Sequence, residues 1–231
     1  MERAPEARQV HSREQLPRST MTELFHRAAE ELAPLVERLF VIIALATVVQ
    51  ADETSIKIQD RVKRGYIWTF VTADAIAYRC SPDRSGETPK QVLGGTEGVL
   101  VVDGYTGYNQ VAGVDGRIRA GCLAHARRKF FESLDVAPEA QEALDQILTI
   151  YEVEYEAEKL GIIGTVDHLV LRKQKIAPRT AKFHAWLVEQ KSLHPPRGKM
   201  GKAIGYALRG WEALTAFLDD AQVPVDNNRS E

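Results

Sequence analysis

The strongest constraint on the fold is an apolar run that ends at an aspartate, within residues 98–108. Residues 99–102 read Val-Leu-Val-Val, and Asp103 and Gly104 follow directly. Three of these four apolar residues are β-branched, which is typical of a strand buried on both faces. A buried strand cannot hold an unpaired carboxylate, so Asp103 is expected where the strand stops. Asp-Gly is also an ordinary turn signal, and this simpler interpretation stays open for Asp103.

A second stretch, residues 47–58, has the same design. Its β-branched residues lead into Asp52 and Glu53, after which the alternation of a strand resumes. Two strands that each carry an Asp predict a pair of carboxylates at one edge of a sheet, the arrangement that a divalent-metal site requires. Spacing alone does not decide between Asp52 and its neighbour Glu53.

Charge and cysteine content exclude several classes of protein. The net charge of −2 and the pI near 6.3 are not those of a basic nucleic-acid-binding domain, so any DNA contact must come from local basic runs. Each such run is, taken singly, more simply a solvated surface. The candidates are residues 61–64, 127–129, 172–175 and 197–199.

Cys80 and Cys122 are the only cysteines, which excludes a disulfide framework and a four-thiolate zinc site. Cys122 and His125 are a suggestive pair, but two ligands do not make a zinc site. The longest apolar stretch, residues 39–49, is too short to span a bilayer, and the first residues do not form a secretory signal. We therefore expect a protein of the reducing cytoplasm, with no membrane span.

Periodicity predicts helices and strands in a mixed order over the first half of the chain. Residues 1–16 are polar and aperiodic, and we expect them to be disordered. A capping-box spacing at residues 20–23 begins a predicted helix that contains Pro34. After the Asp52 strand, the pattern predicts a hairpin at 65–72 and 75–80, helices at 88–93 and 108–112, and strands at 99–102 and 118–122. This order indicates a mixed α/β sheet.

From Ala124 onward the pattern becomes helical. Helices are predicted after Pro138, at residues 166–175 and 179–190, and as one last long helix over residues 203–217. Asp226 or Asn227 is a candidate cap of a helix that barely begins before Glu231. We therefore expect the natural chain to continue.

Several motifs, in this order, resemble the transposases of the insertion sequence 66 family. Each is weak alone, and together they run from about residue 17 to the last residue. They are Gln-Ala-Asp-Glu-Thr at 50–54, Tyr-Arg-Cys-Ser-Pro at 78–82 with Arg-Ser-Gly at 84–86, Val-Asp-Gly-Tyr at 102–105 with Gly-Tyr-Asn at 107–109, Gly-Cys-Leu-Ala-His-Ala-Arg-Arg-Lys-Phe at 121–130, and Asp-Asn-Asn-x-x-Glu at 226–231.

The resemblance implies a ribonuclease-H-like fold with a triad of Asp52, Asp103 and Glu231 that holds two Mg²⁺ ions, Mn²⁺ being the alternative. Glu231 is assigned by resemblance only, since a terminal Glu is ordinarily inert. The implied partners are transposon-end DNA and target DNA, with a homo-oligomer on DNA. The implied organisation is a disordered segment at 1–16, a helix at 17–45, a catalytic core at 46–130, a helical insertion at 131–218 and a truncated core helix at 219–231.

Residues 125–129 are the candidate DNA contacts. Arg127, Arg128 and Lys129 follow a strand at a helix start, where backbone N–H groups and positive side chains both suit phosphate. Helical spacing points them in different directions, so one or two of them are expected to face DNA. His125 is expected either near the DNA backbone or in a structural hydrogen bond.

The family also carries an upstream zinc finger and helix-turn-helix-like region and continues beyond the Glu. The chain thus resembles the catalytic part of a transposase cut at both ends. Two other hypotheses stay open: a non-catalytic DNA-binding or assembly remnant, and a ribonuclease-H-like nuclease unrelated to transposition.

Overall fold

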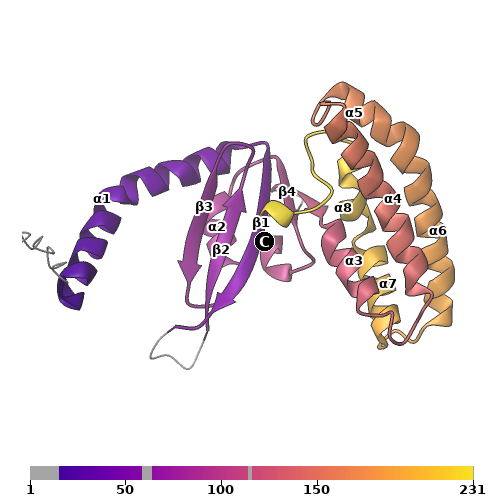
Figure 1. Ribbon diagram of the computed structural model, residues 1–231, viewed down its shortest axis with the longest axis horizontal. Helices are drawn as coiled ribbons and strands as arrows, with labels where there is room; N and C mark the ends of the chain where they lie inside the picture. The colour runs from indigo at the N-terminus through magenta and orange to yellow at the C-terminus, as the bar shows by residue number, and fades with distance from the viewer. Residues whose placement is uncertain (1–15, 59–63, 114–115, 231) are drawn as a thin grey trace, which may run out of the picture. The chain divides into compact units, whose positions relative to one another are not determined.

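The computed structural model describes residues 16–58, 64–113 and 116–230 (Figure 1). The chain divides into two compact units, residues 1–38 and residues 39–231. Helix α1 (Arg18–Leu45) begins in the first unit and ends in the second. The capping box predicted at 20–23 is wrong, because the helix begins at Arg18 and the Thr22 hydroxyl donates to the Arg18 carbonyl. The disorder predicted for 1–16 falls almost wholly outside the described residues.

The second unit is built on one mixed sheet with the strand order β3-β2-β1-β4-β5. β1 pairs antiparallel with β2, and β2 with β3, whereas β4 runs parallel to both β1 and β5. The predicted mixed α/β sheet is therefore confirmed. The strands are β1 (Val48–Ile56), β2 (Gly65–Val71), β3 (Ile76–Ser81), β4 (Val99–Val102) and β5 (Ile118–Gly121).

Short helices supply the connections into the parallel strands. Helix α2 (Glu87–Leu93) precedes β4, as predicted. The helix predicted at 108–112 is a 3-10 helix, η1 (Thr106–Gln110), and precedes β5. Parallel neighbours cannot be joined by a tight hairpin, so these crossovers bring the ends of β1 and β4 to the same edge of the sheet.

The two faces of the sheet have separate hydrophobic cores. On one face, alternate residues of β1 and β4 pack with Phe40 and Ile43 at the end of α1 and with Val92, Leu93 and Tyr108. The strand residues on this face are Val49, Ala51, Leu100 and Val102. Successive side chains of a strand point to opposite faces, so Val101 and Ala120 face the other core.

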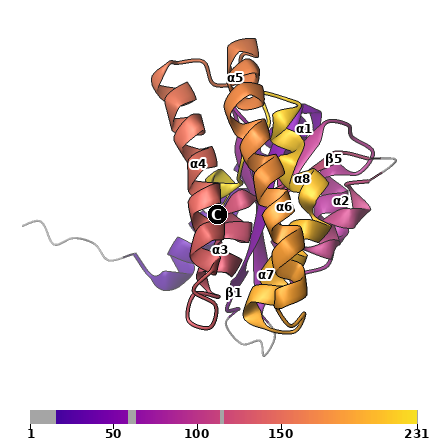
Figure 2. The ribbon, with the colours of Figure 1, turned by 90° about the vertical axis from the view of Figure 1, so that its right-hand side faces the viewer.

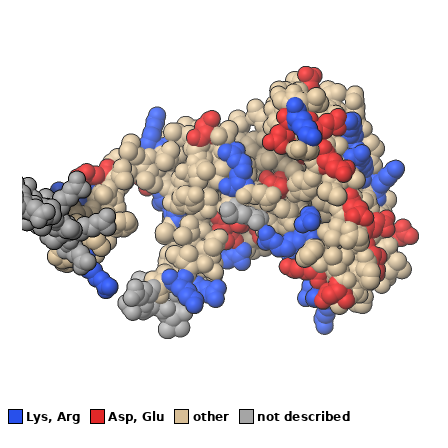
Figure 3. Space-filling model, in the orientation of Figure 1, with Lys and Arg blue, Asp and Glu red and all other residues tan. Residues whose placement is uncertain are grey.

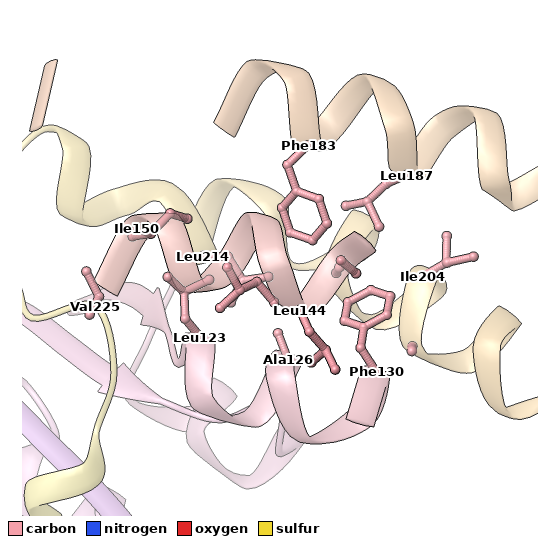
Figure 4. Close-up of a cluster of buried hydrophobic side chains, with 14 of the residues drawn as sticks. Leu123, Ala126, Phe130, Leu144, Ile150, Phe183, Leu187, Ile204, Leu214 and Val225 are labelled. Atoms are coloured by element: carbon pink, nitrogen blue, oxygen red, sulfur yellow. The ribbon is translucent and has the colours of Figure 1, made fainter. Parts of the chain in front are cut away.

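That other core is formed largely by the helical part of the chain, and no strand is present in the described residues after β5. Figure 2 shows α4 and α6 in front of the sheet. The helices are α3 (Leu123–Phe131), α4 (Ala140–Lys159), α5 (Val166–Leu171), α6 (Ala177–Leu193), α7 (Lys199–Arg209) and α8 (Trp211–Thr215). Their apolar faces meet around Phe130, Phe183 and Leu214 (Figure 4).

Two helix predictions need correction. The last long helix is interrupted at Gly210, where α7 ends and α8 begins, because glycine is a poor helix former with the freedom to leave helical geometry. The predicted helices at 166–175 and 179–190 are joined by a π-helical turn, η2 (Arg172–Ile176). None of the described helices is long and apolar enough to cross a membrane.

Candidate active site

Asp52 and Asp103 lie on neighbouring parallel strands. Val48 pairs with Val99, Val49 with Leu100 and Gln50 with Val101. The same offset in sequence relates Asp52 in β1 to Asp103, the residue that directly follows β4. Adjacent strands are roughly 4.8 Å apart, and residues at matching positions of parallel strands share a face. The two aspartates therefore share the face of the sheet that packs against the helices.

Tyr108 lies within the electrostatic influence of these two aspartates and of Glu53. Burial and the charge of Glu53 raise the pKa of Tyr108 well above its ordinary value, and the charges of Asp52 and Asp103 add to that rise. All three carboxylates therefore act on one phenol. Its hydroxyl stays protonated at neutral pH, so it acts as a hydrogen-bond donor.

Glu53 occupies a different environment from Asp52. Its side chain is 1% exposed and points to the opposite face of β1, as alternation along a strand requires. Glu53 Oε1 accepts a hydrogen bond from Arg84 Nε at 2.7 Å, and Oε2 accepts one from the Tyr108 hydroxyl at 2.7 Å. Charged, well-formed pairs of this kind offset the cost of burying a carboxylate. Glu53 is thus an internally paired acid.

The turn after β4 fixes Asp103 locally. Asp103 Oδ1 accepts a hydrogen bond from the Tyr105 backbone N–H at 2.8 Å, which closes an Asx turn. The Tyr105 ring lies under the Arg84 guanidinium, 4.1 Å from ring centroid to carbon. The loop that carries Arg84 is therefore joined both to Glu53 and to the Asp103 turn.

The C-terminal segment returns to the sheet beside Asp52. Asn227 is fully buried, and its Nδ2 donates to the carbonyl of Ala51, the residue before Asp52, at 3.0 Å. The 3-10 helix η4 (Asn228–Ser230) contacts β1 and β2. Glu231, the predicted third carboxylate, lies outside the described residues.

The predicted DNA contacts on α3 separate as helical spacing suggests. Arg127 and Arg128 are exposed, and they line a hollow of about 470 Å³ together with Tyr151 and Asn228. Lys129 turns away, and its Nζ lies 4.7 Å from the centroid of the Tyr206 ring.

His125 is half-buried one turn into α3, and its backbone N–H points at the Cys122 sulfur. Burial raises the pKa of Cys122 to about 11, although the backbone N–H groups of Asn227, His125 and Ala124 oppose the rise. The thiol is therefore protonated at neutral pH and is a poor metal ligand. Cys80 is exposed.

A hollow of about 820 Å³ opens beside Asp103, between β4 and β5 on one side and α7 and α8 on the other. Tyr206 and Arg209 line it from α7, and Arg119 lines it from β5. Burial, followed by the charge of Asp103, raises the pKa of Tyr206 to about 12. Asp103 thus borders a space open to a ligand.

The carboxylates suit a hard divalent cation in kind, because Mg²⁺ prefers oxygen ligands. Within the described part of the chain, no three His, Cys, Asp or Glu side chains are grouped closely enough to hold a metal ion. Two of the three predicted ligands are described, and they share a face and a sheet edge. These two acids supply an incomplete ligand set.

No role was predicted for Arg84, Tyr108 or Arg119, and Asn227 was predicted only as a candidate helix cap. Arg84, Tyr108 and Asn227 fall within the motifs that carry the family resemblance, and this was the one signal in the sequence that could have found them. Arg119 falls in none of these motifs. Their partners are distant in sequence: Arg84 meets Glu53, and Asn227 meets Ala51. Periodicity does not predict pairings of this kind.

The sequence matches the family described as "Transposase IS66 family" over residues 2–231. The chain belongs to the IS66 transposase family. Two similar proteins of Sinorhizobium fredii (strain NBRC 101917 / NGR234), the uncharacterized proteins y4hP and y4jD, are 30% and 32% identical to it. The alignments cover 94% and 92% of this chain, but 44% and 45% of those proteins. The IS66 chain therefore spans less than half the length of the curated relatives that it matches.

Proposed function

We propose that this chain carries the catalytic core of a DNA transposase, which cleaves and rejoins DNA strands with two divalent metal ions. One observation carries the proposal: β1 and β4 are parallel neighbours, and their register, continued past Gln50 and Val101, sets Asp52 beside Asp103 on the same face. The sheet order, with three antiparallel strands followed by two parallel ones, supports a ribonuclease-H-like fold. In this proposal residues 46–130 and 219–231 form the core, and residues 131–218 form a helical insertion.

The proposed ligands are Asp52, Asp103 and Glu231. Mg²⁺ or Mn²⁺ bound there would activate the attacking oxygen and stabilise the leaving oxygen of a phosphodiester. The chain's own task is to hold the two aspartates rigidly at one sheet edge. Asn227, bonded to the Ala51 carbonyl, brings the C-terminal segment toward the same edge.

DNA is the proposed partner, and Arg127 and Arg128 are the proposed phosphate contacts. Both line one hollow with Asn228, on the segment that leads to Glu231. Lys129 covers Tyr206 and is the weaker candidate. On the face shown in Figure 3, Lys and Arg alternate with Asp and Glu over the helical part. This charge distribution therefore agrees better with a few local contacts to DNA phosphates than with a broad basic surface. We also propose that the chain acts on DNA as a homo-oligomer.

The first prediction concerns the two aspartates. Asp52→Asn and Asp103→Asn should each abolish Mg²⁺- or Mn²⁺-dependent nicking of duplexes that carry the ends of the encoding element, because an amide is a much weaker metal ligand than a carboxylate. Denaturing gels of end-labelled DNA measure the nicking. Asp74→Asn, at an exposed position between β2 and β3, is the matched control and should nick normally.

Other outcomes separate the alternative functions. If the chain shifts element-end DNA in gels but never cuts it, while a version lengthened beyond Glu231 does cut, the chain is a binding or assembly portion. Cutting of RNA–DNA hybrids without strand joining would indicate a nuclease unrelated to transposition. Nicking that survives in Asp52→Asn would refute the proposed site.

A further inference from the structure

Arg119 binds the turn that carries Asp103 at two points and the 3-10 helix after it at a third. From β5, its Nη2 donates to the Asp103 carbonyl at 2.8 Å and to the Tyr105 carbonyl at 2.6 Å. Its Nη1 donates to Asn109 Oδ1 at 2.6 Å, on the 3-10 helix that follows. One guanidinium thus joins the first residue of the turn to Asn109, near the end of η1.

The opposite side of the turn is closed by packing. A side chain at Gly104 would meet the Tyr206 ring, since an added Cβ would lie 2.7 Å from Tyr206 Cε2. Tyr105 is held by the Arg84 guanidinium over its ring, and Arg84 is in turn paired with Glu53. With these groups fixed, the direction of the Asp103 carboxylate depends on the backbone of residues 103–105, which Arg119 holds.

We propose that Arg119 is a positioning residue that orients the Asp103 carboxylate toward the metal ions through the backbone of its turn. This inference rests on the proposed function. Arg119 contacts two main-chain carbonyls and an amide oxygen, so it acts by holding the backbone of the turn in place. The planar, five-donor guanidinium can reach three acceptors in one plane, whereas the Lys ammonium is a compact point charge on a flexible stem. Arg119→Lys therefore keeps the charge and loses the geometry.

Arg117 provides a matched control two residues away. It is fully buried, and its guanidinium donates to Thr96 Oγ1 at 2.9 Å and to the carbonyls of Ala46 at 3.0 Å and Ala44 at 2.8 Å. These acceptors join the end of α1 to the sheet and lie outside the Asp103 turn. Arg117→Lys should therefore loosen the contacts at the end of α1 while the chain stays folded and the bonds of the Asp103 turn stay intact.

The experiment measures Mn²⁺ binding and amide exchange in the whole chain. Electron paramagnetic resonance of free Mn²⁺ gives the affinity, and Arg119→Lys should weaken it about tenfold, as is typical when a group that orients a metal ligand is lost. Arg117→Lys should bind Mn²⁺ as the wild type does. Hydrogen exchange of the Tyr105 amide, which donates to Asp103 Oδ1, should quicken in Arg119→Lys and stay slow in Arg117→Lys.

The exchange measurement needs no metal, so it tests the inference by itself. Unchanged Tyr105 exchange in Arg119→Lys, or equal changes in both Lys variants, would overturn it. Asn109→Ala, which removes one acceptor, is the fallback if Arg119→Lys does not fold, and it should quicken the same exchange more mildly. If the wild type binds no Mn²⁺, or Asp103→Asn binds it equally well, the proposed function fails while the exchange result still stands.

Discussion

At the scale of single residues, two adjacent acids on β1 have different surroundings because a strand turns them to opposite faces. Glu53 is enclosed by Arg84 and Tyr108, whereas Asp52 shares its face with Asp103. An acid whose hydrogen-bonding capacity is filled by protein donors is poorly placed to bind a cation. The position of Asp52 on the face of Asp103, with Glu53 turned to the other face, therefore favours Asp52 as the proposed ligand, a choice that spacing in the sequence left open.

Tyr108→Phe tests the enclosure of Glu53. The substitution removes the hydroxyl that donates to Glu53 Oε2 and leaves a buried carboxylate short of one donor. The free energy of unfolding, from urea titration, should fall by about 1–3 kcal/mol. Tyr78→Phe removes a hydroxyl from a side chain that is 61% exposed and should change it by less than about 0.5 kcal/mol. Equal effects of the two substitutions would contradict this account.

At the scale of elements, the π-helical turn between α5 and α6 buries an arginine of a basic run that was expected on the surface. Arg172 begins the basic run 172–175, yet it is 1% exposed. Its Nε and Nη2 donate to Glu154 of α4 at 2.8 and 2.7 Å, and its Nη1 donates to the Phe217 carbonyl at 2.8 Å. Arg172 thus joins α4 to the chain that follows α8, and the simple interpretation of this run as solvated surface is wrong for it.

The sequence predicts those parts of the fold that depend on residues close together along the chain. The strands and most helices were predictable because their signals, β-branched runs and helical spacing, are local. The break at Gly210 is not marked by helical spacing, and the burial of Arg172 in the π turn depends on partners far along the chain, Glu154 and Phe217. The same holds at the candidate site. Asp52 and Asp103 were recognisable because each comes directly after or within a β-branched run, whereas the tie from Arg119 to the Asp103 turn required the fold.

His168, beside Arg172, predicts a pH dependence. Burial lowers the pKa of His168, and the charge of Arg172 adds to this, while Glu154 opposes it. Gly164 N–H donates to His168 Nδ1 at 3.2 Å, which favours the neutral ring. Because the folded pKa lies below the unfolded value of about 6.5, the unfolded state binds more protons as the pH falls through that value. Stability from this group is therefore present above about pH 6.5 and is lost below it.

Urea titrations between about pH 8 and pH 5 check this sign. The stability advantage of the wild type over His168→Gln should be largest near pH 8 and should shrink as the solution is acidified. A stability advantage of the wild type over His168→Gln that grew toward low pH would contradict the lowered pKa of His168.

At the scale of the whole second unit, the helices share a core with one face of the sheet, and the other face has a core of its own. Val101 of β4 and Ala120 of β5 pack in the same cluster as Phe130, Ile147 and Leu214. Neither face of the sheet can therefore be exposed without loss of buried apolar area, at roughly 25 cal/mol per Å². A shared core of this kind favours a single cooperative transition.

Two tryptophans allow the cooperativity to be measured. Trp68 lies in the core on one face of the sheet, and Trp186 lies in the helical core. Variants that keep one of them, with the other and Trp211 changed to Phe, should each show a single urea transition. Each variant's fluorescence midpoint should coincide with its own far-ultraviolet circular dichroism midpoint. A Trp186 signal lost well before the dichroism of its variant would mean that the helices unfold apart from the sheet.

The chain leaves the sheet at Leu123 and returns toward it at Val225. These two residues are joined, because the Leu123 N–H donates to the Val225 carbonyl at 3.0 Å. All the helices from α3 to α8 lie on a loop whose two ends are already tied together. Such a loop can change length or content without altering the spacing of the five strands that precede it. A different insertion at this junction would need apolar side chains that cover Val101 and Ala120. It would then place a different structural unit beside the same two aspartates.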